Sequence, residues 1–365
     1  MLKVEEIFVL VWTYLLIKEI FLKMKITYLF GAGASHTALP TVDEIPKEYE
    51  KFLEIFNNVL KSDSHSIPPI PFESYDSIHY ALHGRLRSFV DHIANHSSID
   101  TYAKKLYLQK NFDDYERYKL CLSIFLDYAQ ISRGPDQRYD TFFASILKEN
   151  VKDFPKNVNV VSWNYDTQFE TAYAGYSGQY SMSGATDSLG LVFKNNSYSD
   201  SVNLKEFNIV KLNGSLGSIS KVDDTFGYLT PRSPSLKRLL NMHDVNAYVT
   251  AFESFTKGES ESLISFAWEG SRRSDIIQKA VEATSDTEVV VVIGYSFPYF
   301  NRNVDRKIFD KMYGLSKVYI QDPNAESLVQ PVQELCQRVN RRGAKRVEVI
   351  PFQGVSQFLI PNELE

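Results

Sequence analysis

Short apolar runs bounded by polar or turn residues recur along the chain. They are rich in β-branched and aromatic residues, which favour strands, and they are apolar at consecutive rather than alternate positions. Such runs are typical of strands that are covered on both faces, as in the parallel sheets of α/β proteins. The predicted strands are ITYLF at 26–30, VNVVSW at 158–163, FNIVKL at 207–212, EVVVVIG at 288–294, KVYIQD at 317–322 and RVEVIPF at 346–352.

Stretches with apolar residues three and four positions apart separate several of these strands and predict helices. Two examples are 274–284 and 324–339, and Pro331 interrupts the second. Strands that alternate with helices predict an α/β fold. Its doubly wound, Rossmann-like and mainly parallel sheet would carry helices on both faces.

The interval between the first two predicted strands is too long for a simple crossover, and its patterning is mostly helical at 72–96 and 115–131. We therefore predict a helical subdomain inserted after the first strand. Two polar, glycine-containing stretches at 181–206 and 214–232 are expected to be loops or covers near the sheet. The predicted division is an N-terminal helix or mis-assigned start at 1–23, the first part of the Rossmann domain at 24–46, the helical insertion at 47–155, the rest of the Rossmann domain at 156–355 and a tail at 356–365.

The apolar run at 7–17 is too short to span a bilayer, which takes roughly 20 apolar residues. No small-residue cleavage site follows it, so a signal peptide is not favoured. Met24 stands directly before the first strand. Two interpretations stay open, translation that begins at Met24 and a genuine packing or oligomerisation helix, and neither involves a membrane.

Charge and cysteine content restrict the function further. The formal net charge of −5 gives the whole molecule no electrostatic reason to bind nucleic acid. The basic residues Arg272 and Arg273 and the run at 341–346 are interpreted as solvated surface. Two cysteines, Cys121 and Cys336, are too few for a four-cysteine zinc site or a disulfide framework. We expect a cytoplasmic protein without a metal.

Glycines, small hydroxyls and polar side chains gather where the predicted strands end. Glycines let the backbone approach a phosphate closely, and polar groups at the carboxyl ends of parallel strands face the ligand crevice. Two of these motifs also have a plain structural alternative, a tight strand-to-helix turn at 31–35 and a helix cap provided by Asp166 or Thr167. The motifs are GAGAS at 31–35, WNYD at 163–166, KLNGS at 211–215, GYSF at 294–297 and, more weakly, IQDPN at 320–324.

Together these motifs, in this order, resemble the sirtuin family over roughly residues 24–325. The residues of these motifs are most similar to those of the sirtuin-like domains of bacterial antiphage defence systems. Members of that group cleave NAD⁺ to nicotinamide and ADP-ribose. The resemblance therefore implies that NAD⁺ is the substrate, bound in a Rossmann-like domain.

The resemblance also assigns residues to the two halves of NAD⁺. Asn164 and Asp166 would face the nicotinamide ribose, and Asn213 stands where the family has its catalytic histidine. Gly214 and Ser215 permit another close approach of the backbone to the ligand. The remaining assignments are Gly31, Ala32, Gly33 and Ser35 to the phosphates, Gly294 and Ser296 to the adenosine half, and, as a loose match, Asp322 and Asn324 to the adenosine ribose.

Two departures from the family change the expected chemistry. Protein-deacylating members carry a four-cysteine zinc module, which this chain lacks, so deacylation is disfavoured. An amide such as that of Asn213 has no useful proton affinity near neutral pH and cannot act as the general base. Cleavage through an oxocarbenium-like state could proceed with water oriented by Asn164 and positive charge stabilised by Asp166. His36, just after the glycine turn, is an alternative base.

These features leave three hypotheses. The first is a partner-activated NAD⁺ hydrolase that acts in abortive infection, and the second is an NAD- or ADP-ribose-binding regulatory subunit without turnover. The third is an ADP-ribosyl transferase or deacylase. The resemblance implies a homo-oligomer and a defence partner, which would be a DNA-translocating ATPase, an Argonaute-like protein or a nucleotide-sensing enzyme.

Overall fold

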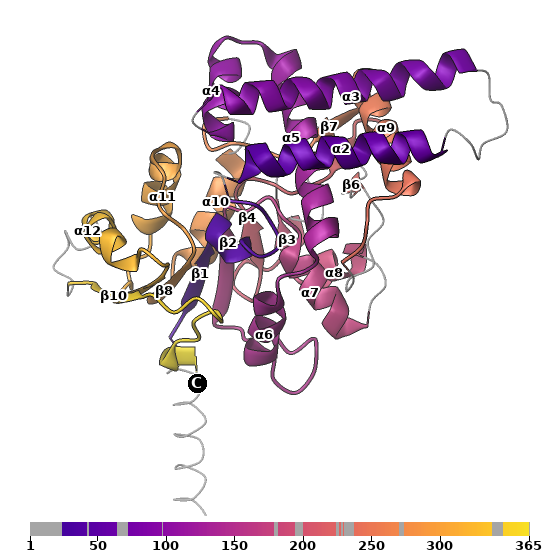
Figure 1. Cartoon of the computed structure of the whole chain (residues 1–365). Coiled ribbons are helices and arrows are strands. Elements are labelled where there is room, and N and C mark those ends of the chain that lie inside the picture. Colours follow the sequence, from indigo (N-terminus) through magenta and orange to yellow (C-terminus); the bar gives the residue numbers. More distant parts are fainter. Residues whose placement is uncertain are drawn as a thin grey trace, which may run out of the picture.

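The computed structural model describes residues 24–41, 44–63, 72–96, 98–178, 182–193, 200–223, 226–227, 229, 237–269, 274–337 and 346–364. Its centre is a seven-stranded, all-parallel sheet with the strand order β10-β9-β8-β1-β2-β4-β3 (Figure 1). The predicted α/β fold with a Rossmann-like sheet is confirmed. The strands are β1 (Ile26–Phe30), β2 (Val158–Ser162), β3 (Leu191–Val192), β4 (Ile209–Lys211), β8 (Val289–Ile293), β9 (Lys317–Gln321) and β10 (Glu348–Phe352).

Helices cover both faces of this sheet because its central strands are apolar at consecutive positions. Tyr28 and Phe30 of β1 pack into one apolar cluster, while Leu29 between them packs into the cluster on the other face. The first face is covered by α6 (Gln137–Ile146), α7 (Gln168–Ser177) and α8 (Met182–Ser188). The second face is covered by α10 (Ser274–Thr284), α11 (Arg302–Phe309) and α12 (Ala325–Cys336), which continues through Pro331.

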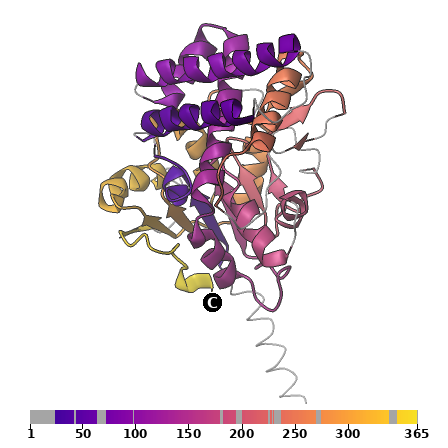
Figure 2. The ribbon, with the colours of Figure 1, turned by 45° about the vertical axis from the view of Figure 1, so that its right-hand side comes forward.

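A second body of helices, the helical cluster, lies at one end of the sheet (Figure 2). It consists of α2 (Ile45–Asp63), α3 (Phe72–Ala94), α4 (Ile99–Leu108), α5 (Phe112–Arg133) and α9 (Met242–Thr256). Its core is aromatic, with Tyr49 stacked on Phe89 at a centroid distance of 4.8 Å. The cluster does not follow the predicted insertion at 47–155 residue for residue. Helix α6 packs on the sheet instead, and α9 joins from far along the chain.

The stretches predicted to be loops at 181–206 and 214–232 contain short regular elements. Helix α8 and edge strand β3 lie in the first stretch. In the second, β5 (Ser218–Ser220) and β6 (Phe226–Gly227) pair with β7 (Ser260–Ser262) in a small antiparallel sheet. These strands are two or three residues long and largely polar, so they lack the apolar runs that identified the others.

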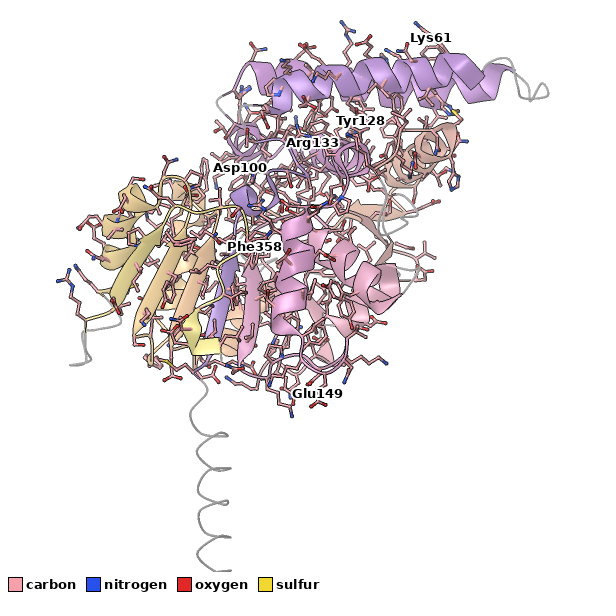
Figure 3. The ribbon with its side chains drawn as sticks, turned by 60° about the horizontal axis from the view of Figure 1, so that its bottom comes forward. Lys61, Asp100, Tyr128, Arg133, Glu149 and Phe358 are labelled. Atoms are coloured by element: carbon pink, nitrogen blue, oxygen red, sulfur yellow. The ribbon has the colours of Figure 1, made fainter. Side chains whose placement is uncertain are left out.

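The helical cluster faces the carboxyl ends of the parallel strands. Figure 3 shows Lys61, Tyr128 and Asp100 in the cluster, and Glu149, which precedes β2, at the opposite end of the molecule. Among the described residues, no helix combines the length and apolar character needed to cross a bilayer. The predicted N-terminal segment at 1–23 and the basic pair Arg272–Arg273 lie outside the described residues, as does the basic run 341–346 except for Arg346.

Candidate functional site

The register of the parallel strands brings the sequence motifs together at the edge of the sheet formed by the carboxyl ends of its strands. Phe30 at the end of β1 pairs with Ser162 of β2 on one side and with Ile293 of β8 on the other. Ser162 pairs in turn with Lys211 at the end of β4. The turns that follow these strands therefore start side by side. We call residues 31–35, 163–166, 211–215 and 294–297 the edge site.

Two glycine turns of the edge site interlock. The amide of Gly33 donates to the carbonyl of Gly294 at 2.9 Å, and a Cβ on Gly294 would lie 2.4 Å from the nitrogen of Ala34. Gly294 also has a φ of +57°, which L side chains rarely adopt. A Cβ on Gly31 would meet the Cα of Tyr295 at 2.6 Å. Close packing of one turn against the other thus explains these glycines without a ligand, so they are weaker evidence for a phosphate than the sequence suggested.

The segment after GAGAS is shorter than a nucleotide-binding helix. Residues Ala32–Ser35 form a single 3₁₀ turn, and the next α-helix among the described residues, α2, begins only at Ile45. Ala32 and Gly33 are exposed, whereas Ser35 is buried. The expected phosphate contacts therefore reduce to the exposed backbone of the turn, because the Ser35 hydroxyl points into the protein.

The Ser35 hydroxyl is the centre of a buried polar network. It donates to Oδ2 of Asp166 at 2.7 Å and lies 2.7 Å from the Tyr139 hydroxyl and 3.3 Å from Nδ2 of Asn164. A hydroxyl has one proton and two lone pairs, so Tyr139 and Asn164 must both donate to it. Ser35 is fully satisfied, and it connects the first glycine turn to the WNYD turn.

Asp166 lies in the interior, directly beneath the surface of the edge site. Its side chain also accepts from the backbone amide of Gln168 at 3.1 Å, and the residue is only 2% exposed. Burial raises the pKa of this carboxyl, while Lys211 and the hydrogen bonds from Ser35 and Gln168 oppose the rise. The structure thus places the Asp166 side chain in the interior against Ser35, rather than at the exposed surface of the edge site.

We predict that Ser35→Ala lowers the free energy of unfolding by about 1–3 kcal/mol, because Asp166 and Tyr139 each lose a buried partner. The same change should raise the pKa of Asp166 further, since the Ser35 hydroxyl favours its charged form. Urea unfolding of the two proteins measures the difference. Ser145→Ala is the matched control: Ser145 is exposed and bonds only locally to Thr141, so a change within about 0.5 kcal/mol is expected. Equal effects of the two substitutions would contradict the network.

Asn164 is held in place by its amide nitrogen. Its Nδ2 donates to the carbonyl of Gly31 at 2.9 Å as well as to Ser35, and the residue is 6% exposed. Both N–H groups are then in use. The described residues supply no donor to Oδ1, which leaves that oxygen as the group able to accept a hydrogen bond from a ligand or a water molecule.

Asn213 is adjacent but turned toward β2. Its Nδ2 donates to the carbonyl of Trp163 at 2.8 Å, and it is 8% exposed. Gly214 has a φ of +75°, and a Cβ there would lie 1.9 Å from the carbonyl oxygen of Leu263. Gly214 is therefore needed for packing against the segment after β7. Ser215 is buried too and accepts from Lys211, so both residues have packing roles in the structure.

A buried ion pair under the site was not anticipated from the sequence. Nζ of Lys211 lies 2.9 Å from Oε1 of Glu170 and 3.0 Å from Oγ of Ser215, and it also donates to the carbonyl of Asp166. Both side chains of the ion pair are at most 1% exposed. This lysine uses all three donors and connects β4 to the WNYD turn.

Arg138, also missed, holds the first glycine turn from the other side. Its guanidinium donates to the carbonyl of Ala34 at 2.8 Å and to Asp136 at 2.6 Å, and it lies 5.0 Å from the ring centre of Phe358. It also lies 2.9 Å from Nδ1 of His36. The same nitrogen lies 3.1 Å from the carbonyl of Gly33, so the His36 ring is in contact with both the glycine turn and Arg138. The role of His36 as an alternative base stays a prediction.

The helical cluster reaches the site through Gln130 of α5. Its Oε1 accepts from the amide of Thr167 at 3.1 Å and from Nε2 of Gln168 at 2.9 Å. These contacts fix the start of α7 directly after WNYD. A lone glutamine inside a helix gives no sequence signal for such a role, because the pairing depends on tertiary structure.

The adenosine-side residues lie along the same edge. Ser296 is exposed, and the amide of Gly294 donates to the carbonyl of Gln321 at 2.9 Å, beside Asp322. Oδ1 of Asp322 accepts from the amide of Asn324 at 2.8 Å, a local turn that starts α12. These two residues thus have a structural role and remain accessible. Among the described residues, no group of three or more histidine, cysteine, aspartate or glutamate side chains is arranged to hold a metal.

The chain matches no model of a known protein family, and a search among curated proteins finds no match.

Proposed function

We propose that the edge site binds NAD⁺ and hydrolyses the bond between nicotinamide and ribose. The observation that carries this proposal is that the motifs of the edge site meet at the carboxyl ends of the parallel strands. Four motifs far apart in the sequence meet at the ends of β1, β2, β4 and β8, and Gly33 bonds Gly294 while Asn164 bonds Gly31. β1 and β8 are neighbours from which the chain winds outward in opposite directions, and doubly wound sheets bind ligands at such a switch point.

In the proposed reaction, water adds to C1′ of the nicotinamide ribose and the C–N bond breaks. Nicotinamide leaves with the electron pair of that bond, and the water proton passes to solvent, so NAD⁺ and water give nicotinamide, ADP-ribose and H⁺. Oδ1 of Asn164 would accept a hydrogen bond from the attacking water. The buried Asp166, through Ser35, would add negative potential where the ribose becomes positive.

In the cell, the proposed role is that of an effector in bacterial antiphage defence. Unregulated NAD⁺ cleavage would kill the host, so the activity would wait for an activating partner. The partner would be a DNA-translocating ATPase, an Argonaute-like protein or a nucleotide-sensing enzyme, and the chain would act as an oligomer. Nicotinamide release by the purified full chain, alone and with the product of the neighbouring gene, tests the proposal. Release in neither sample, with no binding of NAD⁺, would contradict it.

A second candidate, an NAD- or ADP-ribose-binding regulatory subunit, is favoured by Asn213. This residue is a neutral amide already engaged with the Trp163 carbonyl, so it supplies no base. Binding of NAD⁺ or ADP-ribose without nicotinamide release, even with the partner present, would select this candidate over the hydrolase.

We predict that Asn213→His raises nicotinamide release at least about tenfold. Nδ1 of a histidine can donate to the Trp163 carbonyl as Nδ2 of Asn213 does, which leaves Nε2 as a base. The gain should appear as pH rises through about 6.5, where an ordinary histidine loses its proton. Asn213→Gln is the control and should show no gain. A histidine variant that binds NAD⁺ normally and is no faster at any pH would show that a base is not what limits the reaction.

A further inference from the structure

Asp305 of α11 lies beneath two turns of the edge site and contacts both. Its Oδ1 accepts from Nε1 of Trp163 at 3.2 Å, and its Oδ2 is 2.9 Å from the hydroxyl of Tyr295. Trp163 directly precedes Asn164, and Tyr295 directly follows Gly294. Asp305 itself is only 3% exposed. One carboxyl thus connects the WNYD turn with the GYSF turn.

The two aromatic residues are themselves well placed to transmit this connection. Their rings are stacked, with centroids 5.9 Å apart and an interplanar angle of 15°. The backbone of Trp163 donates to the carbonyl of Phe30 at 2.9 Å and accepts from Asn213 at 2.8 Å. A shift of the Trp163 ring would therefore displace the backbone at the ends of β1, β2 and β4 together.

We propose that Asp305 is a positioning residue of the edge site, which sets the relative placement of Asn164 and Gly294 through Trp163 and Tyr295 and changes that placement when it takes up a proton. The structural part of this proposal stands on the contacts alone. Its catalytic consequence depends on the proposed function.

The surroundings of Asp305 disfavour its charged form. Toward the sheet, the carboxyl faces a small space lined by uncharged side chains, among them Thr27, Leu29, Val161 and Val290. On the other side it lies in the wall of a cavity of about 210 Å³ between α11 and α12, which also holds the charged groups of Arg302, Arg306 and Glu334. Burial raises the pKa of Asp305 to about 7, against the smaller opposing effects of the two hydrogen bonds.

Protonation near this pH changes the hydrogen-bond pattern. Above pH 7 the carboxylate accepts from both Trp163 and Tyr295. Below pH 7 one oxygen carries a proton and can donate it to the Tyr295 hydroxyl, which must then accept, while Trp163 still donates to the other oxygen. Asparagine reproduces this second pattern, because its Oδ1 can accept from Trp163 while its Nδ2 donates to Tyr295.

The test uses the ¹⁵N-labelled full chain and the indole N–H signal of Trp163, identified by its loss in Trp163→Phe. The wild-type signal should shift with a midpoint near pH 7, and the shift should vanish in Asp305→Asn. Asp310→Asn, on the adjoining turn, is the matched control and should keep the transition. A wild-type signal that does not move between pH 6 and 8, or one that still moves in Asp305→Asn, overturns the proposal.

Turnover adds a second readout. In Asp305→Asn, kcat/KM for NAD⁺ cleavage should not change between pH 6 and pH 8, and it should equal the wild-type value at pH 6. Asp305→Ala should lower kcat about tenfold at both pH values. A wild-type pH profile kept unchanged by Asp305→Asn would count against the positioning role. Turnover absent from every protein, with the indole transition intact, would count against the proposed function and for the connection through Asp305.

Discussion

Lys211→Met should lower the free energy of unfolding by about 3–5 kcal/mol, the usual range when one partner of a buried ion pair is removed. The lysine neutralises Glu170, whose side chain is fully buried, and it donates to Ser215 and to the Asp166 carbonyl. Without it, the carboxylate of Glu170 would remain charged in the interior or take up a proton. Urea unfolding at neutral pH measures the loss.

The companion variant for this experiment is Lys211→Met with Glu170→Met. Replacing a buried ion pair by apolar side chains of similar volume is often neutral or stabilising, so the double variant should recover most of the loss. Lys257→Met serves as the surface control. Its pair with Glu253 spans 2.9 Å, but the two side chains are 56% and 49% exposed, and we expect no measurable change in the free energy of unfolding. A double variant as unstable as the sum of its parts would refute the account of this pair.

Asn164→Ala should reduce nicotinamide release by an active complex about 10²–10³-fold. The substitution removes the only group of the WNYD turn assigned to the attacking water, together with its bonds to Gly31 and Ser35. The rate under saturating NAD⁺ is the quantity to measure, alongside the circular dichroism spectrum, which should be unchanged.

Asn95→Ala is the matched control for that experiment. Asn95 is an exposed asparagine just after α3, and among the described residues its side chain bonds only to the carbonyl of Asp91, so its removal should leave the rate unaltered. If Asn164→Ala cleaved NAD⁺ as fast as the wild type, Asn164 could not orient the water, and the chemistry would have to lie with other residues.

The central sheet was predictable because its strands carry their own signal. Residues 26–30 were predicted as a strand and form β1, and 274–284 were predicted as a helix and form α10. Burial on both faces requires unbroken apolar runs, and such runs can be read without a structure. Strand β3, with two residues, and the polar strand β7 are stabilised by their neighbours rather than by their composition, so no local pattern predicted them.

The candidate site was predictable in position but only partly in detail. Motifs that end parallel strands must meet at one edge, and they do. What each residue does there depends on contacts across the fold. Gly294 meets Ala34, Asp166 faces Ser35 and Lys211 pairs with Glu170 over 41 positions of sequence. A glycine that makes room for another turn looks the same in sequence as one that makes room for a phosphate.

Helix α9 packs with α2 to α5 but follows them by more than a hundred residues in the sequence, which affects folding during synthesis. Tyr248 of α9 donates to Asp127 of α5 at 2.9 Å, inside a core most of whose residues lie between Ile45 and Tyr128. When α5 leaves the ribosome, that partner has not yet been synthesised. The emerging helices expose aromatic faces until α9 is made, and transiently exposed apolar surface of this kind promotes aggregation. We therefore expect the nascent chain to be prone to aggregation while the segment between α5 and α9 is translated.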